Sequence, residues 1–131
     1  MPTRASRAGV DIAVLTTDQL QQQPKFDAVF CDAPCSGSGT WRRTPDAKWR
    51  LTEDRLDQLI RSQATVLDAA APLVAAGGVL IYATCSVLTH ENQDAVDRFC
   101  TRSPEWGIRR NTQRLPDADG DGFFTCVLLK R

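Results

Sequence analysis

Residues 26–39 read FDAVFCDAPCSGSG, and this stretch decides the fold. Its first six residues, 26–31, form an apolar run that is typical of a buried strand. Asp32, a proline, a cysteine and a run of serines and glycines follow directly. In α/β proteins the carboxyl ends of strands carry ligand and catalytic groups, so the stretch predicts a site as well as a strand.

The rest of the chain supplies further strands and two amphipathic helices. Thr52 is a suitable N-cap for a helix with apolar positions between residues 56 and 74, with Pro72 in its last turn and Gly77-Gly78 ending it. A second helix is expected over about 91–102. Further strands are expected at residues 10–15 (VDIAVL), 79–83, 107–111 and 123–129. This order predicts a single α/β domain over residues 1–131, its sheet mostly parallel and finishing in an antiparallel hairpin.

A second thiol lies at the end of the strand expected at residues 79–83. That strand leads into Thr84-Cys85-Ser86, and the carboxyl ends of neighbouring parallel strands meet at one edge of a sheet. We therefore expect Cys35 and Cys85 to face one crevice.

Composition sets limits on class and location. The 131 residues carry 16 basic and 16 acidic side chains, so a surface for a polyanion has to be a local patch. The longest apolar runs fall short of the roughly 18 residues of a membrane span, and we expect a cytoplasmic protein. Its five cysteines are odd in number and irregularly spaced, which favours reduced thiols. Cys31, Cys100 and Cys126 lie in apolar runs and are expected in the core.

Local chemistry alone leaves the role of residues 32–39 open. A thiol nucleophile needs a base, and the single histidine, His90, is five residues beyond Cys85, at a position more typical of the surface. Zinc prefers clustered ligand pairs, and none has suitable spacing, so no metal site is expected. The serine–glycine run lacks the Gly-Lys-Ser/Thr of a P-loop. A tight turn that needs glycine remains the simplest alternative.

Four linked motifs carry a resemblance to a known family. They are DAPCSGSG at residues 32–39, RRTPDAKW at 42–49, YATCSVLTHEN at 82–92 and DGFF at 121–124. In order and spacing they resemble the Nol1/Nop2/Sun family of RNA 5-methylcytosine methyltransferases, most closely the bacterial 16S rRNA members. The resemblance implies a Rossmann-like sheet, S-adenosylmethionine as methyl donor and RNA, expected to be rRNA, as substrate.

The resemblance also implies roles for individual residues. Cys85 corresponds to the nucleophile that adds to carbon 6 of cytosine, and Cys35 to the thiol that assists product release. Asp32 corresponds to the carboxylate beside the target base. Asp18, Asp32 and Pro34 correspond to cofactor-binding positions, Asp18 near the adenine amino group. DNA cytosine-5 methyltransferases instead use a Pro-Cys cysteine as nucleophile, and this reading stays as an alternative, disfavoured by TCS and DGFF.

The segment after the serine–glycine run is basic and aromatic. Cations with stacking aromatics suit an RNA strand. The candidate RNA-binding residues are Arg42, Arg43, Lys48 and Arg50, with Trp41 and Trp49 beside them. A solvated loop is the alternative.

The sequence departs from the family at its amino-terminal side. A G-x-G-x-x-G turn after an early strand is missing, and residues 10–15 correspond to the third strand of the family's sheet. We therefore expect a sheet that lacks the first two strands, with the cofactor site incomplete and the chain inactive or weakly active alone. Residues 10–15 are expected to re-pair through oligomerisation or strand exchange, or to be poorly ordered. The competing hypothesis is an inactive RNA-binding or dimerising remnant.

Overall fold

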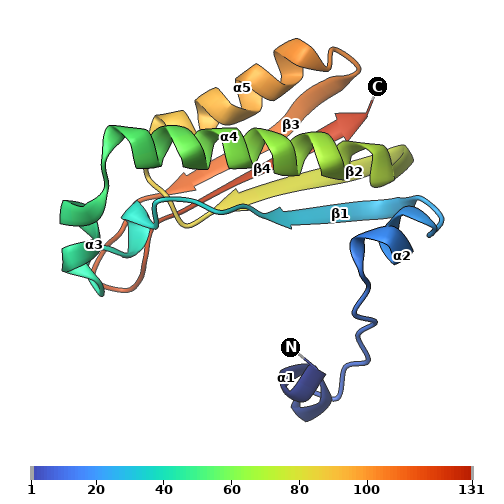
Figure 1. Ribbon diagram of the computed structural model, residues 1–131, viewed down its shortest axis with the longest axis horizontal. Coiled ribbons are helices and arrows are strands. Elements are labelled where there is room, and N and C mark those ends of the chain that lie inside the picture. Colours follow the sequence, from blue (N-terminus) through green and yellow to red (C-terminus); the bar gives the residue numbers. More distant parts are fainter. Residues whose placement is uncertain (1, 131) are drawn as a thin grey trace.

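The computed structural model describes residues 2–130 and contains one four-stranded sheet in the order β1-β2-β4-β3 (Figure 1). The strands are β1 (Phe26–Asp32), β2 (Val74–Thr84), β3 (Trp106–Arg114) and β4 (Phe123–Lys130). The helices are α1 (Pro2–Arg7), α2 (Thr17–Gln21), α3 (Pro45–Arg50), α4 (Glu53–Ala70) and α5 (Gln93–Arg102). Short 3₁₀ turns are η1 (Ser38–Thr40), η2 (Ala71–Leu73) and η3 (Thr89–Glu91).

Strand pairing confirms the predicted fold class. β1 and β2 are parallel, β2 and β4 are antiparallel, and β3 and β4 form the antiparallel hairpin. Asp32 is the register partner of Ala83, and Ala33 N–H donates to the Ala83 carbonyl at 2.9 Å. The carboxyl ends of β1 and β2 are therefore side by side, and this places the site.

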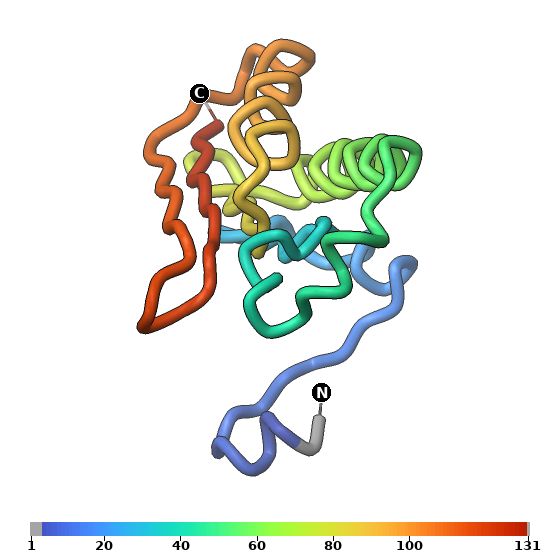
Figure 2. The backbone as a smooth tube through the Cα atoms, turned by 90° about the vertical axis from the view of Figure 1, so that its left-hand side faces the viewer, coloured from blue at the N-terminus to red at the C-terminus, as the bar shows by residue number. Residues whose placement is uncertain are grey.

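The core lies between the sheet and the two long helices, α4 and α5 (Figures 1 and 2). Fully buried side chains come from α4 (Leu67), α5 (Phe99) and the inner strands (Leu80, Tyr82 and Leu128). Cys31 and Cys126 are buried in this core and Cys100 packs against it, as predicted. Burial raises the pKa of Cys31 to about 11 and that of Cys126 to about 12, so both stay protonated.

The predicted end of the long helix was wrong. Thr52 does cap α4, its hydroxyl accepting from Arg55 N–H at 3.2 Å, but the helix ends at Ala70 and η2 contains Pro72. Proline cannot donate an N–H and collides with the preceding turn, which explains the early end. Gly77 and Gly78 then belong to β2, where a Cβ on Gly78 would come within 2.8 Å of the Asp27 carbonyl.

The strand predicted at residues 10–15 is absent from the described part of the chain. These residues run outside the sheet between α1 and α2 (Figures 1 and 2), and Val10, Ile12 and Val14 are exposed, Val14 by 66%. An extended segment becomes a strand only when a neighbour satisfies its backbone groups. In the described part of the chain no strand lies beside residues 10–15 to provide that neighbour.

None of the helices within residues 2–130 is long and apolar enough to cross a membrane.

Candidate active site

The two predicted thiols meet at the carboxyl ends of β1 and β2. Cys85 follows directly after β2, Cys35 lies in the loop after β1, and their Sγ atoms are 3.4 Å apart. Both side chains are partly buried. The structure thus brings the two thiols together as predicted, and Cys35 also lines a pocket.

Burial decides the protonation of one thiol. Desolvation raises the pKa of Cys35 to about 12, and the neighbouring Cys85 adds to the rise. The backbone N–H of Gly37 opposes the shift without cancelling it. Cys35 therefore keeps its proton at neutral pH and can donate it toward the sulfur of Cys85.

Gly39 joins three of the four sequence motifs. Its N–H donates to the Cys85 carbonyl at 2.9 Å, and its carbonyl accepts from Gly122 N–H at 2.9 Å. A Cβ at Gly39 would lie 2.2 Å from the Gly122 carbonyl oxygen, so only glycine fits between these backbones. We call these contacts of Gly39 with Cys85 and Gly122 the junction. Arg43 reinforces it through an ion pair with Asp121, the neighbour of Gly122, at 2.5 Å. The DGFF motif is thereby brought to the thiols, although Asp121 comes 36 residues after Cys85 and 86 residues after Cys35 along the chain.

A buried polar cluster behind the thiols was missed by the sequence reasoning. Glu91 is fully buried and accepts hydrogen bonds from Ser36, Ser86 and Gln63. Ser36 and Ser86 directly follow the two cysteines. The available signal was that Glu91 belongs to the YATCSVLTHEN motif.

Asp32 lies on the rim of a pocket beside the free edge of β1. The pocket has a volume of about 460 Å³ and is lined by Asp32, Phe30, and the α2 residues Thr17 and Leu20, among others. Asp18 is exposed in the first turn of the same short helix, so the structure brings its helix and Asp32 to one pocket. Pro34 is exposed, and its carbonyl accepts from Gln63 Nε2 at 3.0 Å, a bond within the protein rather than toward a ligand.

Basic side chains gather on the other side of Cys35. Arg50 and Arg55 line a pocket of about 380 Å³ together with Cys35 and Ser36. Arg50 was a predicted RNA-binding residue, whereas Arg55, in the first turn of α4, was missed.

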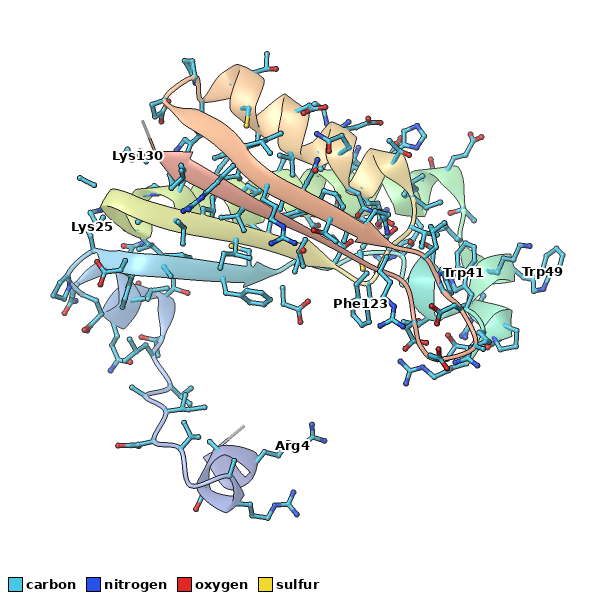
Figure 3. All side chains as sticks on the ribbon, turned by 180° about the vertical axis from the view of Figure 1, so that it is seen from behind. Arg4, Lys25, Trp41, Trp49, Phe123 and Lys130 are labelled. Atoms are coloured by element: carbon cyan, nitrogen blue, oxygen red, sulfur yellow. The ribbon has the colours of Figure 1, made fainter. Side chains whose placement is uncertain are left out.

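The remaining basic candidates lie near this pocket on the surface. Arg42 is exposed, Arg43 pairs with Asp121, and the Lys48 ammonium lies 5.6 Å from the centre of the Trp49 ring. Trp49 is 83% exposed, and Figure 3 shows it pointing into solvent at the same end of the molecule as Trp41 and Phe123. His90 is exposed on η3, as its position suggested. Within residues 2–130 no group of three or more metal-ligating side chains could hold a metal ion.

Comparison with known proteins gives this arrangement a family. A family model described as 16S rRNA methyltransferase RsmB/F matches residues 4–128. The chain belongs to this family. The resemblance carried by the four motifs is thereby confirmed.

Relatives of this RsmB/F family member agree with the match. Ribosomal RNA small subunit methyltransferase B of Salmonella paratyphi B is 40% identical over 117 residues, covering 83% of this chain and 27% of that protein. The chain thus spans about a quarter of the length of the curated relatives it matches. The solved structure of PH0851 is 33% identical, with a TM-score of 0.75, over 79% of this chain and 26% of that one. NSun6 from Pyrococcus horikoshii, solved with SFG, shares the fold at a TM-score of 0.80 and 23% identity, over 99% of this chain and 38% of that one.

Proposed function

We propose that residues 1–131 form the carboxyl-terminal, thiol-bearing part of a single methyltransferase catalytic domain that produces 5-methylcytosine in rRNA. The observation that carries the proposal is the 3.4 Å approach of Cys35 and Cys85 in a member of the RsmB/F family. One thiol in a crevice could be structural; two in contact at adjacent strand ends suit a reaction that forms and then breaks a bond to sulfur.

The chemistry of carbon 5 explains the need for two thiols. Carbon 5 of cytosine is a poor nucleophile, and addition of the Cys85 thiolate to carbon 6 pushes the electrons of the 5,6 double bond toward it. S-adenosylmethionine, when bound, supplies the methyl group for carbon 5. A water molecule then takes the proton of carbon 5, the 5,6 double bond re-forms, and the carbon–sulfur bond breaks to return the Cys85 thiolate. Cys35, adjacent to that sulfur, is assigned to this release.

Asp32 is assigned to the cytosine ring. It is exposed at the end of β1, beside the loop that carries Cys35, where a carboxyl group can hydrogen-bond the base edge. Such a bond would favour protonation of the ring while the thiolate adds.

The described residues fit one side of a cofactor site. The 460 Å³ pocket falls within the range of small-molecule sites, and its mixture of apolar walls with Thr17 and Asp32 suits a flat ring with a polar rim. Asp18 and Asp32 would hold the cofactor there, while Pro34 would shape the loop beside it. The glycine-rich turn of such sites has no counterpart in the sequence, so binding by this chain alone should be weak.

RNA is assigned to the basic side of the thiols. Arg42, Arg43, Lys48 and Arg50 lie on one loop and short helix after the Cys35 loop, and Arg55 adds a further cation at the pocket. Cations at this position would hold the phosphates while the base reaches Cys85.

Trapping of the covalent adduct tests the assignment. The chain would be incubated with 16S rRNA and a large excess of S-adenosylmethionine, which offsets weak cofactor binding, then denatured and examined for protein–RNA adducts. Cys35→Ala should accumulate adduct because its release is slowed about 100-fold or more, whereas Cys85→Ala should form none. Cys100→Ala is the matched control, since this thiol packs against the core away from the pair. Adduct in Cys85→Ala and none in Cys35→Ala would transfer the nucleophile to Cys35, as in the DNA enzymes.

The second function that we propose is RNA binding or dimerisation without catalysis. It is favoured by the basic residues Arg50 and Arg55 at the Cys35 pocket and by the exposed apolar side chains of Val10, Ile12 and Val14. Calorimetry with S-adenosylmethionine and with rRNA separates the two. Measurable cofactor binding supports the enzyme, and RNA binding without cofactor binding supports the remnant.

A further inference from the structure

Glu91 is a carboxylate in an unusual place. It is 0% exposed, and none of the ion pairs in the described part of the chain includes it. Burying such a group costs free energy unless hydrogen bonds surround it, so its presence next to the thiols calls for a role.

Both oxygens of Glu91 are saturated by donors. Oε1 accepts from Ser36 N–H at 2.8 Å and from Gln63 Nε2 at 3.1 Å. Oε2 accepts from the hydroxyls of Ser36 and Ser86, each at 2.5 Å. The carboxylate therefore bridges the residue after Cys35 and the residue after Cys85.

The direction of these bonds follows from counting protons. The hydroxyl of Ser38 accepts from Val87 N–H, so its one proton goes to Ser86 Oγ, 2.9 Å away. Ser86 Oγ also accepts from Leu88 N–H at 3.0 Å, and its own proton is left for Glu91. The hydroxyl of Ser36 accepts from Ser38 N–H at 3.3 Å and likewise donates to Glu91. Every chain of donors ends on Glu91.

Glu91 is fixed from two elements, α4 at its carboxylate and β2 at its backbone carbonyl. Gln63 of α4 donates to Glu91 and also to the carbonyl of Pro34, the residue before Cys35. Tyr82 of β2 donates from its hydroxyl to the Glu91 carbonyl at 2.7 Å. Gln63 Oε1 is buried without a partner, so it is the donating end of this amide that the cluster uses.

We propose that Glu91 is a positioning residue that sets the separation of the Cys35 and Cys85 sulfurs. Its place in the reaction rests on the proposed function, but its effect on the thiols does not. Replacement by glutamine keeps the shape and presents an N–H₂ to hydroxyls whose protons already point there. The hydroxyl groups of Ser36 and Ser86 then have to rotate away. The loops that carry Cys35 and Cys85 thereby lose the carboxylate oxygen that accepts hydrogen bonds from both.

Closure of a Cys35–Cys85 disulfide reports on this separation without RNA or cofactor. Diamide takes up the two electrons and two protons of the thiols and is reduced to the hydrazine, while the sulfurs close from 3.4 Å to about 2.05 Å. The folded chain would be treated with diamide, quenched by alkylation and analysed by mass spectrometry. We expect Glu91→Gln to slow closure about tenfold or more, because such intramolecular steps depend steeply on geometry. Glu105→Gln, on the exposed loop before β3, should close at the wild-type rate.

Two further variants keep the test decisive. Leu67→Ala loosens the core without touching the cluster, and equal slowing in this variant would make Glu91 merely structural and overturn the proposal. If Glu91→Gln does not fold, Ser36→Ala removes one bond to the carboxylate and should slow closure by a smaller factor, with Ser62→Ala on the exposed side of α4 as control. Wild-type closure in a folded Glu91→Gln or in Ser36→Ala would also overturn it. Slow closure in Glu91→Gln, combined with no RNA adduct in the Cys35→Ala variant, would leave the positioning role standing and remove the proposed function alone.

Discussion

At the scale of single residues, Gly39 is the position with the least room. We predict that Gly39→Ala lowers the free energy of unfolding by about 1–3 kcal/mol, because the Gly122 carbonyl, 2.2 Å from the new Cβ, has to move. Urea denaturation measures the change. Gly120→Ala is the control, since its Cβ would meet the flexible end of Arg114, and its effect should stay within about 0.5 kcal/mol. Equal free energies of unfolding for Gly39→Ala and the parent would show that the Gly122 backbone moves away from the new Cβ at no cost.

The proton on Cys35 leads to a prediction about its reactivity. Because burial raises its pKa to about 12, the thiolate is scarce at pH 8, and alkylation by iodoacetamide should be far slower than for a free cysteine with a pKa of about 8.5. Its labelling rate should rise steadily between pH 8 and pH 10. Mass spectrometry of the alkylated peptides follows Cys35 separately from the other thiols. Labelling as fast as that of free cysteine at pH 8 would contradict the assignment.

At the scale of elements, the start of α4 depends on one hydroxyl. Thr52→Ala removes the acceptor for Arg55 N–H and should lower the free energy of unfolding by about 1 kcal/mol. Thr65→Ala, within the same helix, is the control; the Thr65 hydroxyl donates to the Arg61 carbonyl, and its loss should change the free energy of unfolding by less than about 0.5 kcal/mol. Thermal or urea unfolding compares the two. If Thr65→Ala lowered the free energy of unfolding as much as Thr52→Ala does, the N-cap hydrogen bond would not be what stabilises the start of α4.

Which elements could be predicted from the sequence depends on where their partners lie. β1, β2, α4, α5 and the hairpin carry their own apolar patterns, and turn residues separate them, so pattern alone predicted that they exist, although the end of α4 and the start of β2 were misplaced. Residues 10–15 have an equally good strand pattern, but whether they pair is decided by neighbours and not by the pattern. For the same reason Cys35 and Cys85 could be predicted to meet, since the topology guarantees it, whereas the burial of Glu91 depends on how α4 and η3 pack.

At the scale of the whole molecule, apolar surface is left without a cover. Val10, Ile12 and Val14 are exposed, as is Phe30 on β1, whose outer edge has no partner in the described sheet. We predict self-association through these surfaces, visible as a concentration-dependent sedimentation coefficient. Ile12→Lys together with Val14→Lys should shift the equilibrium to monomer, because charges oppose strand pairing. Asp11→Lys in the same segment is the control, and a wild type that stays monomeric at high concentration would contradict the prediction.

Alkaline pH should also weaken the fold as a whole. Burial raises the pKa of Cys31 to about 11 and that of Cys126 to about 12, so between pH 9 and 11 the unfolded chain loses protons that the native one keeps. Fewer protons on the unfolded state mean that stability falls as the pH rises. Urea unfolding at pH 7.5 and pH 10 under reducing conditions measures the slope, and Cys31→Ala should make it shallower. A free energy of unfolding that is unchanged at pH 10 would contradict the burial of these thiols.

The junction at Gly39 divides the hairpin into a part that evolution can lengthen and a part that it cannot. Asp117 closes the apex on itself by accepting from the N–H groups of Asp119 and Gly120, independently of the thiols. Gly122, two residues after Gly120, donates a hydrogen bond to Gly39, and Gly39 in turn donates one to Cys85. Insertions within the Asp117 turn would leave the Gly122–Gly39 hydrogen bond in place. A single residue inserted next to Gly122 would instead shift the hairpin relative to the sulfurs of Cys35 and Cys85. Natural length variation, and any engineered fusion, therefore belongs at the apex.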